Sequence, residues 1–175
     1  MNTAPRLQLW EGGVDLIIER RPALSPEQAW AQLTGPRATE QWFAPWIWLD
    51  EDAGLLDFGD AGYGLVVACE PGQAVLIEFG GQAGPEGEID FSASWRLGAT
   101  VNDDVIVFTM TFVPSDDGLD VQEIAEAGPV LEYFADRFEA YAERIALPED
   151  PESHMERLED QYRQLAARFA QEHGL

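Results

Sequence analysis

The first clear pattern along the chain is the alternation of apolar and polar residues from Val14 to Arg21, where β-branched side chains dominate. This alternation predicts a strand with one buried face, which ends before Pro22. Further short apolar or alternating runs lie at 46–48, 55–58, 63–69, 74–79, 89–97 and 105–113. Segments rich in Gly, Pro, Asn and Asp separate them, and no crossover helices intervene. The strands are therefore predicted to pair as hairpins in an antiparallel meander.

Two short helices are predicted directly after the first strand. Ser25 supplies an N-cap hydroxyl, Pro26 suits the first helical position, and Gln28 can bond back to the Ser25 amide. The segment 34–36, Thr-Gly-Pro, ends this helix and starts a second one that reaches Trp42.

A long helix is predicted in the region 119–147, where the periodicity becomes helical. The residues of its apolar face are Val130, Leu131, Phe134, Phe138, Tyr141 and Ile145. Gly128 and Pro129 interrupt the pattern, and proline is costly inside a helix. We therefore expect the helix to begin near Gly128, with 121–127 as a separate turn or short helix.

A second amphipathic helix is predicted after a hinge at 147–151. Its apolar stripe is Met155, Leu158, Tyr162, Leu165 and Phe169. Such a stripe must be buried on the chain's own domain, in a homodimer or against a protein partner, and the sequence leaves these alternatives open. The expected organisation is one domain over 1–147 and a helical extension over 148–175.

The residues that carry a family resemblance are DLIIER at 15–20 and LSPEQAWAQLTGPRATEQWFAPW at 24–46. They resemble the opening of the START-like or SRPBCC superfamily, and most closely the branch related to the C-terminal domain of the activator of the Hsp90 ATPase. The resemblance covers 14–147, with a weaker echo at 109–112. It implies an α+β helix-grip fold, similar to Bet v 1: a curved antiparallel sheet of about six or seven strands around a long C-terminal helix, with an apolar cavity between them. It implies no single activity, because relatives include lipid and hormone binders, polyketide cyclases and chaperone activators.

Composition narrows the classes of partner. With 175 residues and 46% hydrophobic content, the chain fits one globular domain. Its net charge is -23, and all ten basic residues are arginine, so binding to nucleic acid or to a membrane surface is disfavoured. The sequence shows neither a signal peptide nor a long apolar span, and a cytoplasmic protein is expected. The single Cys69 is predicted to be a small buried apolar residue.

Catalytic chemistry is poorly supported by the residue types present. Both histidines, His154 and His173, lie in the terminal helix, so no catalytic residue, metal or cofactor is expected in the cavity domain. A buried carboxylate could act as an acid or base, and the conceivable positions are Asp57, Glu78, Asp90 and Glu132.

The aromatic residues give the candidate cavity walls. The residues expected to contact a ligand are Trp42, Phe43, Trp46, Trp48, Tyr63, Phe79, Phe91, Trp95, Arg96, Phe112, Leu131, Phe134 and Phe138. They favour binding of a hydrophobic or aromatic small molecule. The alternatives are a protein-interaction module like the chaperone activators and a cyclase-like enzyme that uses a buried carboxylate.

Overall fold

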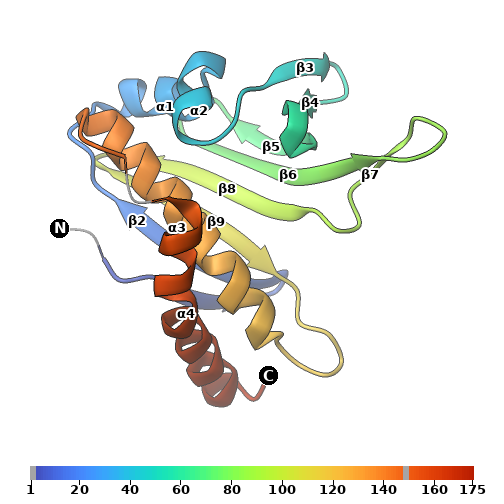
Figure 1. The fold of residues 1–175 in the computed structure, drawn as a ribbon, viewed down its shortest axis with the longest axis vertical. Helices are drawn as coiled ribbons and strands as arrows, with labels where there is room; N and C mark the ends of the chain where they lie inside the picture. The colour runs from blue at the N-terminus through green and yellow to red at the C-terminus, as the bar shows by residue number, and fades with distance from the viewer. Residues whose placement is uncertain (1–2, 148–149) are drawn as a thin grey trace.

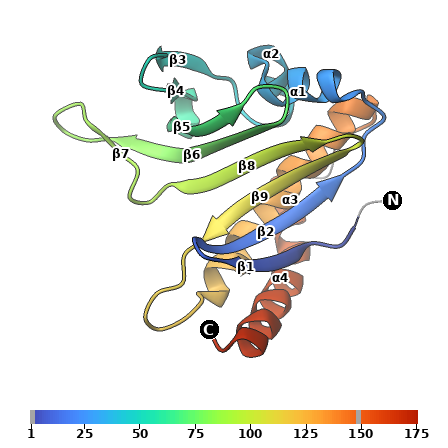
Figure 2. The same ribbon diagram turned by 180° about the vertical axis from the view of Figure 1, so that it is seen from behind.

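The computed structural model describes residues 3–147 and 150–175, and it shows a curved antiparallel sheet with two long helices on one side (Figure 1). The strands are β1 Arg6–Trp10, β2 Gly13–Arg20, β3 Ile47–Asp50, β4 Leu55–Asp57, β5 Tyr63–Glu70, β6 Ala74–Ala83, β7 Ile89–Asp90, β8 Trp95–Asn102 and β9 Val105–Phe112. The helices are α1 Pro26–Thr34, α2 Pro36–Trp42, the 3₁₀ turn Gly59–Ala61, α3 Val121–Glu143 and α4 Pro151–His173. Figure 2 shows the same fold from behind, with the sheet in front of α3 and α4.

The main sheet has the strand order β1-β2-β9-β8-β6-β5-β4-β3, and β7 pairs with β6. All pairings are antiparallel, and β2 lies beside β9, with Val14 opposite Phe112 and Ile18 opposite Phe108. Alternate residues of β9 are buried, and they form the core under α3 together with Val14, Leu16 and Ile18 of β2. The predicted helix-grip fold is confirmed.

The strand count exceeds the expected six or seven for two reasons. The run 89–97 was expected to be one strand, but Asp90 accepts hydrogen bonds from the Ser92 amide and hydroxyl, and this turn separates β7 from β8. The strand β1 was not predicted at all. Its sequence, RLQLW, does alternate, but the strand has only five residues and just Leu7 is half-buried, so it is an exposed edge strand that sequence reasoning passed over.

The two short helices follow the sequence prediction. The Ser25 hydroxyl accepts from the Gln28 amide at 3.3 Å, and the Gln28 side chain accepts from the Ser25 amide at 3.0 Å. This reciprocal cap fixes the start of α1. Gly35 lies between α1 and α2, and Pro36 begins the second helix.

The predicted start of the long helix near Gly128 is wrong, because α3 runs without a break from Val121 through Pro129. The carboxylate of Asp120 caps its first turn by accepting from the amides of 122 and 123. Ile124 and Ala125 are fully buried in that turn. Packing of the first two turns therefore outweighs the hydrogen bond that Pro129 cannot donate.

The helix α4 packs along α3, and Gly128 marks their close approach. A Cβ atom built on Gly128 would lie 2.3 Å from the Cδ1 atom of Tyr162, so only glycine fits there. Within the predicted apolar stripe, Leu158, Tyr162 and Phe169 are buried against the chain itself, while Met155 and Leu165 are half-buried. The structure thus shows the intramolecular alternative, and a dimer or partner contact through α4 stays a prediction. Residues 148 and 149 of the predicted hinge lie outside the described residues.

A buried ionic cluster joins β2, α3 and α4. The Arg20 side chain is 4% exposed, and its guanidinium bonds to Asp136 at 2.5 and 2.9 Å. Glu132 and Glu139 lie within 3.5 and 3.8 Å of it. The Tyr162 hydroxyl donates to Glu132 at 2.6 Å, so the cluster also fixes α4. A buried guanidinium requires such partners.

The hydroxyl of Tyr162 is expected to stay protonated at alkaline pH while the fold persists. Burial, followed by the nearby Glu132 carboxylate, raises the pKa of this phenol above its ordinary value. The contribution to stability is present below a pH of about 10 and is lost above it, because unfolding then releases the proton. In a native ultraviolet titration, Tyr162 should ionise only as the protein unfolds.

The variant Tyr162→Phe is the control for this titration. It should lose about 1.5–3 kcal/mol of stability at neutral pH, since the removed hydrogen bond is to a charged group. The late-ionising tyrosine should be missing from its titration curve. Ionisation of all four wild-type tyrosines within the folded protein would contradict the burial argument.

Candidate functional site

A pocket of about 380 Å³ lies between the concave face of the sheet and the helices α1, α2 and α3. It occupies the end of the sheet near the β5–β6 turn. The residues that line it are Trp30, Leu33, Thr34, Thr39, Trp42, Phe43, Trp46, Trp48, Leu56, Phe58, Val66, Cys69, Val75, Ile77, Leu97, Gly98, Ala99, Phe108, Leu131 and Phe134. None of these residues is charged.

The helical wall of the pocket is held by hydrogen bonds within α1 and α2. The indole N–H of Trp42 donates to the Gln32 carbonyl at 3.0 Å and ties the second helix to the first. The Thr34 hydroxyl donates to the Trp30 carbonyl at 2.8 Å, and the Thr39 hydroxyl donates to the Pro36 carbonyl at 3.1 Å. The polar hydrogens of these side chains are therefore already used inside the protein.

The sheet supplies the floor of the pocket through alternate residues of adjacent strands. In the register, Val75 lies opposite Ala99, and Ile77 lies opposite Leu97. Cys69 lies opposite Val75 on the next strand, so its side chain shares their face. Cys69 is exposed, which corrects the prediction that it is buried, because it lies near the turn where the strands leave the core.

A cluster of phenylalanines closes one side of the pocket. The ring of Phe43 lies 4.8 Å from Phe79, 4.8 Å from Phe134 and 5.7 Å from Phe58, measured between centroids. Edge-to-face and tilted contacts of this kind are favourable and keep the rings in place. The rings of Phe43 and Phe134 thus pack against each other where the pocket wall meets α3.

Six of the predicted ligand-contacting residues are brought together at this pocket. They are Trp42, Phe43, Trp46, Trp48, Leu131 and Phe134. The structure places them on α2, the following loop, β3 and α3, which converge above the sheet. Their contact with a ligand stays a prediction.

The other seven predicted residues do not line the pocket. Tyr63, Phe79, Phe91 and Trp95 gather at the opposite end of the same strands: Tyr63 lies opposite Gly81, and Phe79 opposite Trp95. Phe91 lies over Gly81, where an added Cβ atom would come within 2.5 Å of its ring. Tyr63, Phe91 and Trp95 therefore lie too far from the pocket to line it. Phe79 does not line the pocket itself but packs against Phe43 and Phe58, which do.

The remaining three predicted residues have structural contacts elsewhere. Phe138 is fully buried between Trp42 and Phe108, with centroid distances of 5.2 and 5.5 Å. Phe112 is buried at the far end of β9. Arg96 lies next to Leu97, so its side chain points to the convex face, where it pairs with Glu78 at 2.6 Å.

Sequence reasoning missed seven aliphatic wall residues because it concentrated on aromatic side chains, and it also missed three aromatic ones. The missed aliphatic and aromatic positions are Trp30, Leu33, Leu56, Phe58, Val66, Val75, Ile77, Leu97, Ala99 and Phe108. Most of them are the inward positions of the predicted strands. The register of the strands shows which of these inward positions lie beside the pocket. The sequence pattern alone does not give that register.

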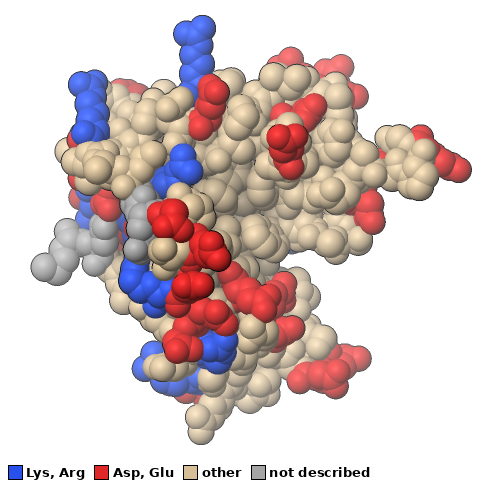
Figure 3. Space-filling view, in the orientation of Figure 1, with Lys and Arg blue, Asp and Glu red and all other residues tan. Residues whose placement is uncertain are grey.

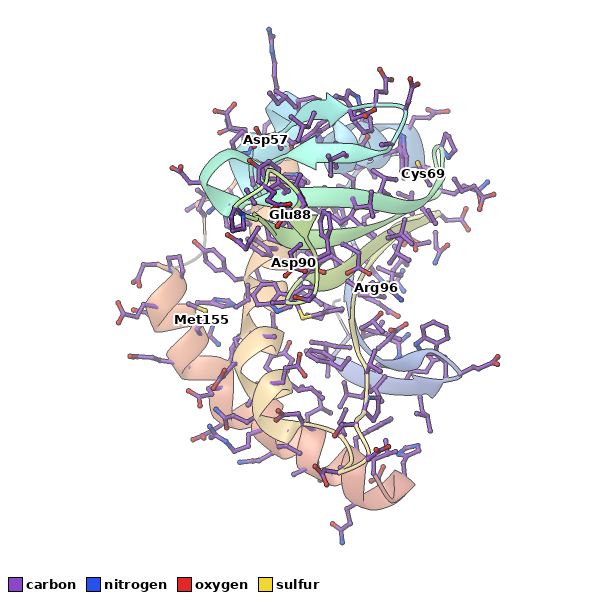
Figure 4. All side chains as sticks on the ribbon, turned by 90° about the vertical axis from the view of Figure 1, so that its right-hand side faces the viewer. Asp57, Cys69, Glu88, Asp90, Arg96 and Met155 are labelled. Atoms are coloured by element: carbon purple, nitrogen blue, oxygen red, sulfur yellow. The ribbon has the colours of Figure 1, made fainter. Side chains whose placement is uncertain are left out.

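The four conceivable catalytic carboxylates all have structural partners, and none lines the pocket. Asp57 accepts from the Gly59 amide, Glu78 binds Arg96, and Glu132 accepts from Tyr162. Hydrogen bonds from the Ser92 amide, and then from its hydroxyl, lower the pKa of Asp90. Figure 4 shows Asp57, Asp90 and Arg96 on the sheet, together with Cys69. These carboxylates do not form an acid–base site at the pocket.

The charged surface is uneven. Figure 3 shows acidic side chains gathered along α3 and α4, whereas the surface between α3 and the β3–β4 region is largely uncharged. Across 3–147 and 150–175, His, Cys, Asp and Glu residues nowhere gather in a group of three that could hold a metal ion. Within the same ranges, no helix combines the length and apolarity needed to cross a membrane.

Comparisons with known proteins identify the fold alone. No family model and no curated protein matches the sequence. The crystal structure of CalU16 from Micromonospora echinospora is similar with a TM-score of 0.65 and 16% identity, over 95% of this chain and 96% of CalU16. A protein of Bordetella parapertussis, encoded by gene BPP1335, has a TM-score of 0.61 and 15% identity over 90% of this chain and 87% of its own. DynU16, from the dynemicin biosynthetic locus, has a TM-score of 0.53 and 18% identity over 74% of this chain and 47% of DynU16.

Proposed function

We propose that this protein binds a hydrophobic or aromatic small molecule in the pocket between α1, α2, α3 and the sheet. The observation that carries the proposal is an uncharged pocket of about 380 Å³, with six Trp and Phe side chains from its helices and connecting segments. Ligand sites have volumes of about 300–1,000 Å³ and mostly apolar linings. The fold of DynU16, a protein of a biosynthetic locus, agrees with a role in small-molecule chemistry.

The proposal is binding rather than catalysis. A cyclase-like reaction by proton transfer would need an acid or base beside the ligand. The lining residues contain no Asp, Glu or His, and the four conceivable carboxylates have other partners. Binding alone requires only the shape and apolarity that the pocket has.

The test is native mass spectrometry of the purified protein, followed by denaturing extraction of any bound compound. A stoichiometric apolar molecule, or saturable binding of members of an aromatic and lipid library, is expected. A clean ligand-free mass after exposure to the whole library would contradict the proposal.

Filling the pocket is expected to abolish this binding. Ala99 is a half-buried residue of the pocket floor, and Ala99→Phe would place a ring in the cavity. The matched control is Thr100→Phe, because the adjacent residue of β8 points to the opposite face and does not line the pocket. We expect at least about a 30-fold loss of affinity in Ala99→Phe, equivalent to about 2 kcal/mol, and little change in the control. Equal effects of both substitutions would locate binding elsewhere.

A protein-interaction module, similar to the Hsp90 ATPase activators, is the second candidate. The observation in its favour is the edge strand β3, where Ile47, Trp48 and Leu49 are 65%, 42% and 51% exposed. Exposed apolar edge strands pair readily with other chains. Contact through α4 has less support, because Leu158, Tyr162 and Phe169 are already buried. Failure of the small-molecule test would favour a partner at β3.

A further inference from the structure

The pocket offers no positive charge to a ligand. Its lining residues include no arginine, and the chain has no lysine. Arg96 belongs to the neighbouring floor strand, but it points to the convex face and pairs with Glu78. Arg20 lies under α3 in its own cluster with Asp136. An anionic group inside the pocket would therefore be removed from water without a counter-charge, which is costly.

The pocket also has few polar hydrogens to donate. The hydroxyls of Thr34 and Thr39 donate to carbonyls of their own helices, and the Trp42 indole donates to Gln32. These groups cannot donate at the same time to a carboxylate or sulfonate on the ligand. The pocket thus lacks the cation with which proteins most strongly stabilise a buried anion, and the side-chain N–H donors that remain at its wall are the uncharged indole groups of Trp30, Trp46 and Trp48.

The electrostatic field of the whole protein also disfavours anionic ligands. The net charge of -23 repels anions that approach the protein, and acidic side chains are dense on α3 and α4 (Figure 3). We infer that the pocket selects uncharged aromatic ligands and rejects the same molecules when they carry a carboxylate or sulfonate. This inference rests on the proposed function, and it names the class of ligand that the same pocket takes.

The test uses two fluorescent probes that differ by one charged group. N-phenylnaphthylamine is uncharged, and anilinonaphthalenesulfonate is the same ring system with a sulfonate. We expect the uncharged probe to bind one site at least about tenfold more tightly, because the sulfonate must either lose water or stay outside. Equal or tighter binding of the sulfonate would overturn the inference and leave the proposed function intact. Failure of both probes to bind would overturn both.

Measurements in high salt distinguish the effect of the pocket lining on anion binding from the effect of distant surface charges. In about 1 M salt the screening length falls to about 3 Å, so repulsion by distant carboxylates is removed. The discrimination between the probes should persist, since it comes from the wall itself. Its disappearance in high salt would show that the surface charge alone rejects anions and would overturn the inference.

A pair of arginine variants tests the missing counter-charge directly. Thr34→Arg adds a cation at the pocket wall, whereas Ala31→Arg adds the same charge on the exposed side of α1. Thr34→Arg should tighten sulfonate binding at least about tenfold, as an added charge partner does, and Ala31→Arg should not. Circular dichroism and thermal melting confirm that both variants fold. Equal gains in the two variants would contradict the inference.

Discussion

Replacing Arg20 by methionine is expected to lower the free energy of unfolding by about 3 kcal/mol or more, because it leaves several carboxylates without their buried cation. The guanidinium is 4% exposed and contacts Asp136, Glu132 and Glu139. Methionine keeps most of the apolar stem, so the loss reports the charge rather than packing. Urea denaturation of the variant at neutral pH gives the measurement.

The cost of Arg20→Met should become smaller in mild acid. Acid removes negative charge from carboxylates, which weakens both their attraction to Arg20 in the wild type and their mutual repulsion in the variant. The difference in the free energy of unfolding between the two proteins should therefore narrow as the pH falls. A difference that is independent of pH would contradict the ionic account.

Arg96→Met is the matched control for Arg20→Met. The Arg96 side chain is 41% exposed and pairs with Glu78 on the convex face. Surface pairs contribute about 0–1 kcal/mol, so the control should be nearly neutral. Equal losses in the two variants would show that burial of Arg20 has no special effect.

Truncating Phe138 is expected to destabilise the protein by about 3–5 kcal/mol, the range for a large buried aromatic side chain. Phe138 is fully buried, and its ring packs against Trp42 and Phe108, which both line the pocket. The Phe138→Ala variant should also weaken ligand binding, since the helix and sheet walls lose their common support. Thermal and urea unfolding measure the first effect, and probe titration measures the second.

Phe134→Ala, one helical turn earlier, is the control for Phe138→Ala. Phe134 is half-buried and faces the pocket, so its truncation enlarges an existing space instead of opening a new one. Its loss of stability should be clearly smaller. A larger loss in Phe134→Ala than in Phe138→Ala would contradict the assignment of core and pocket faces on α3.

Local features of the fold could be predicted from the sequence because their causes are local. Ser25 and Gln28 cap α1 within one turn, and the glycine and proline at 35–36 separate α1 from α2 as predicted. The resemblance to helix-grip proteins gave the long-range arrangement, which periodicity alone does not supply. The pairing of β2 with β9 joins residues nearly a hundred positions apart, and it follows from the whole core.

The errors of sequence reasoning come from contacts between distant segments. Gly128 was interpreted as a helix breaker, but it is the point where the ring of Tyr162 touches α3. Its role depends on a residue of another helix. The pocket was interpreted as a gathering of aromatic residues, but Tyr63 and Trp95 lie at the end of the sheet away from Cys69 and Val75. Only the register of β5, β6 and β8 shows that these two pairs of residues lie at different ends of the sheet.

The most direct test of ligand binding at this pocket is the alkylation rate of Cys69. It is the single cysteine of the chain, it is exposed, and it lies on the pocket wall. A saturating uncharged probe such as N-phenylnaphthylamine should slow its reaction with N-ethylmaleimide, with the same concentration dependence as the fluorescence of the bound probe. Unchanged alkylation at full probe saturation would place the ligand elsewhere and contradict the account.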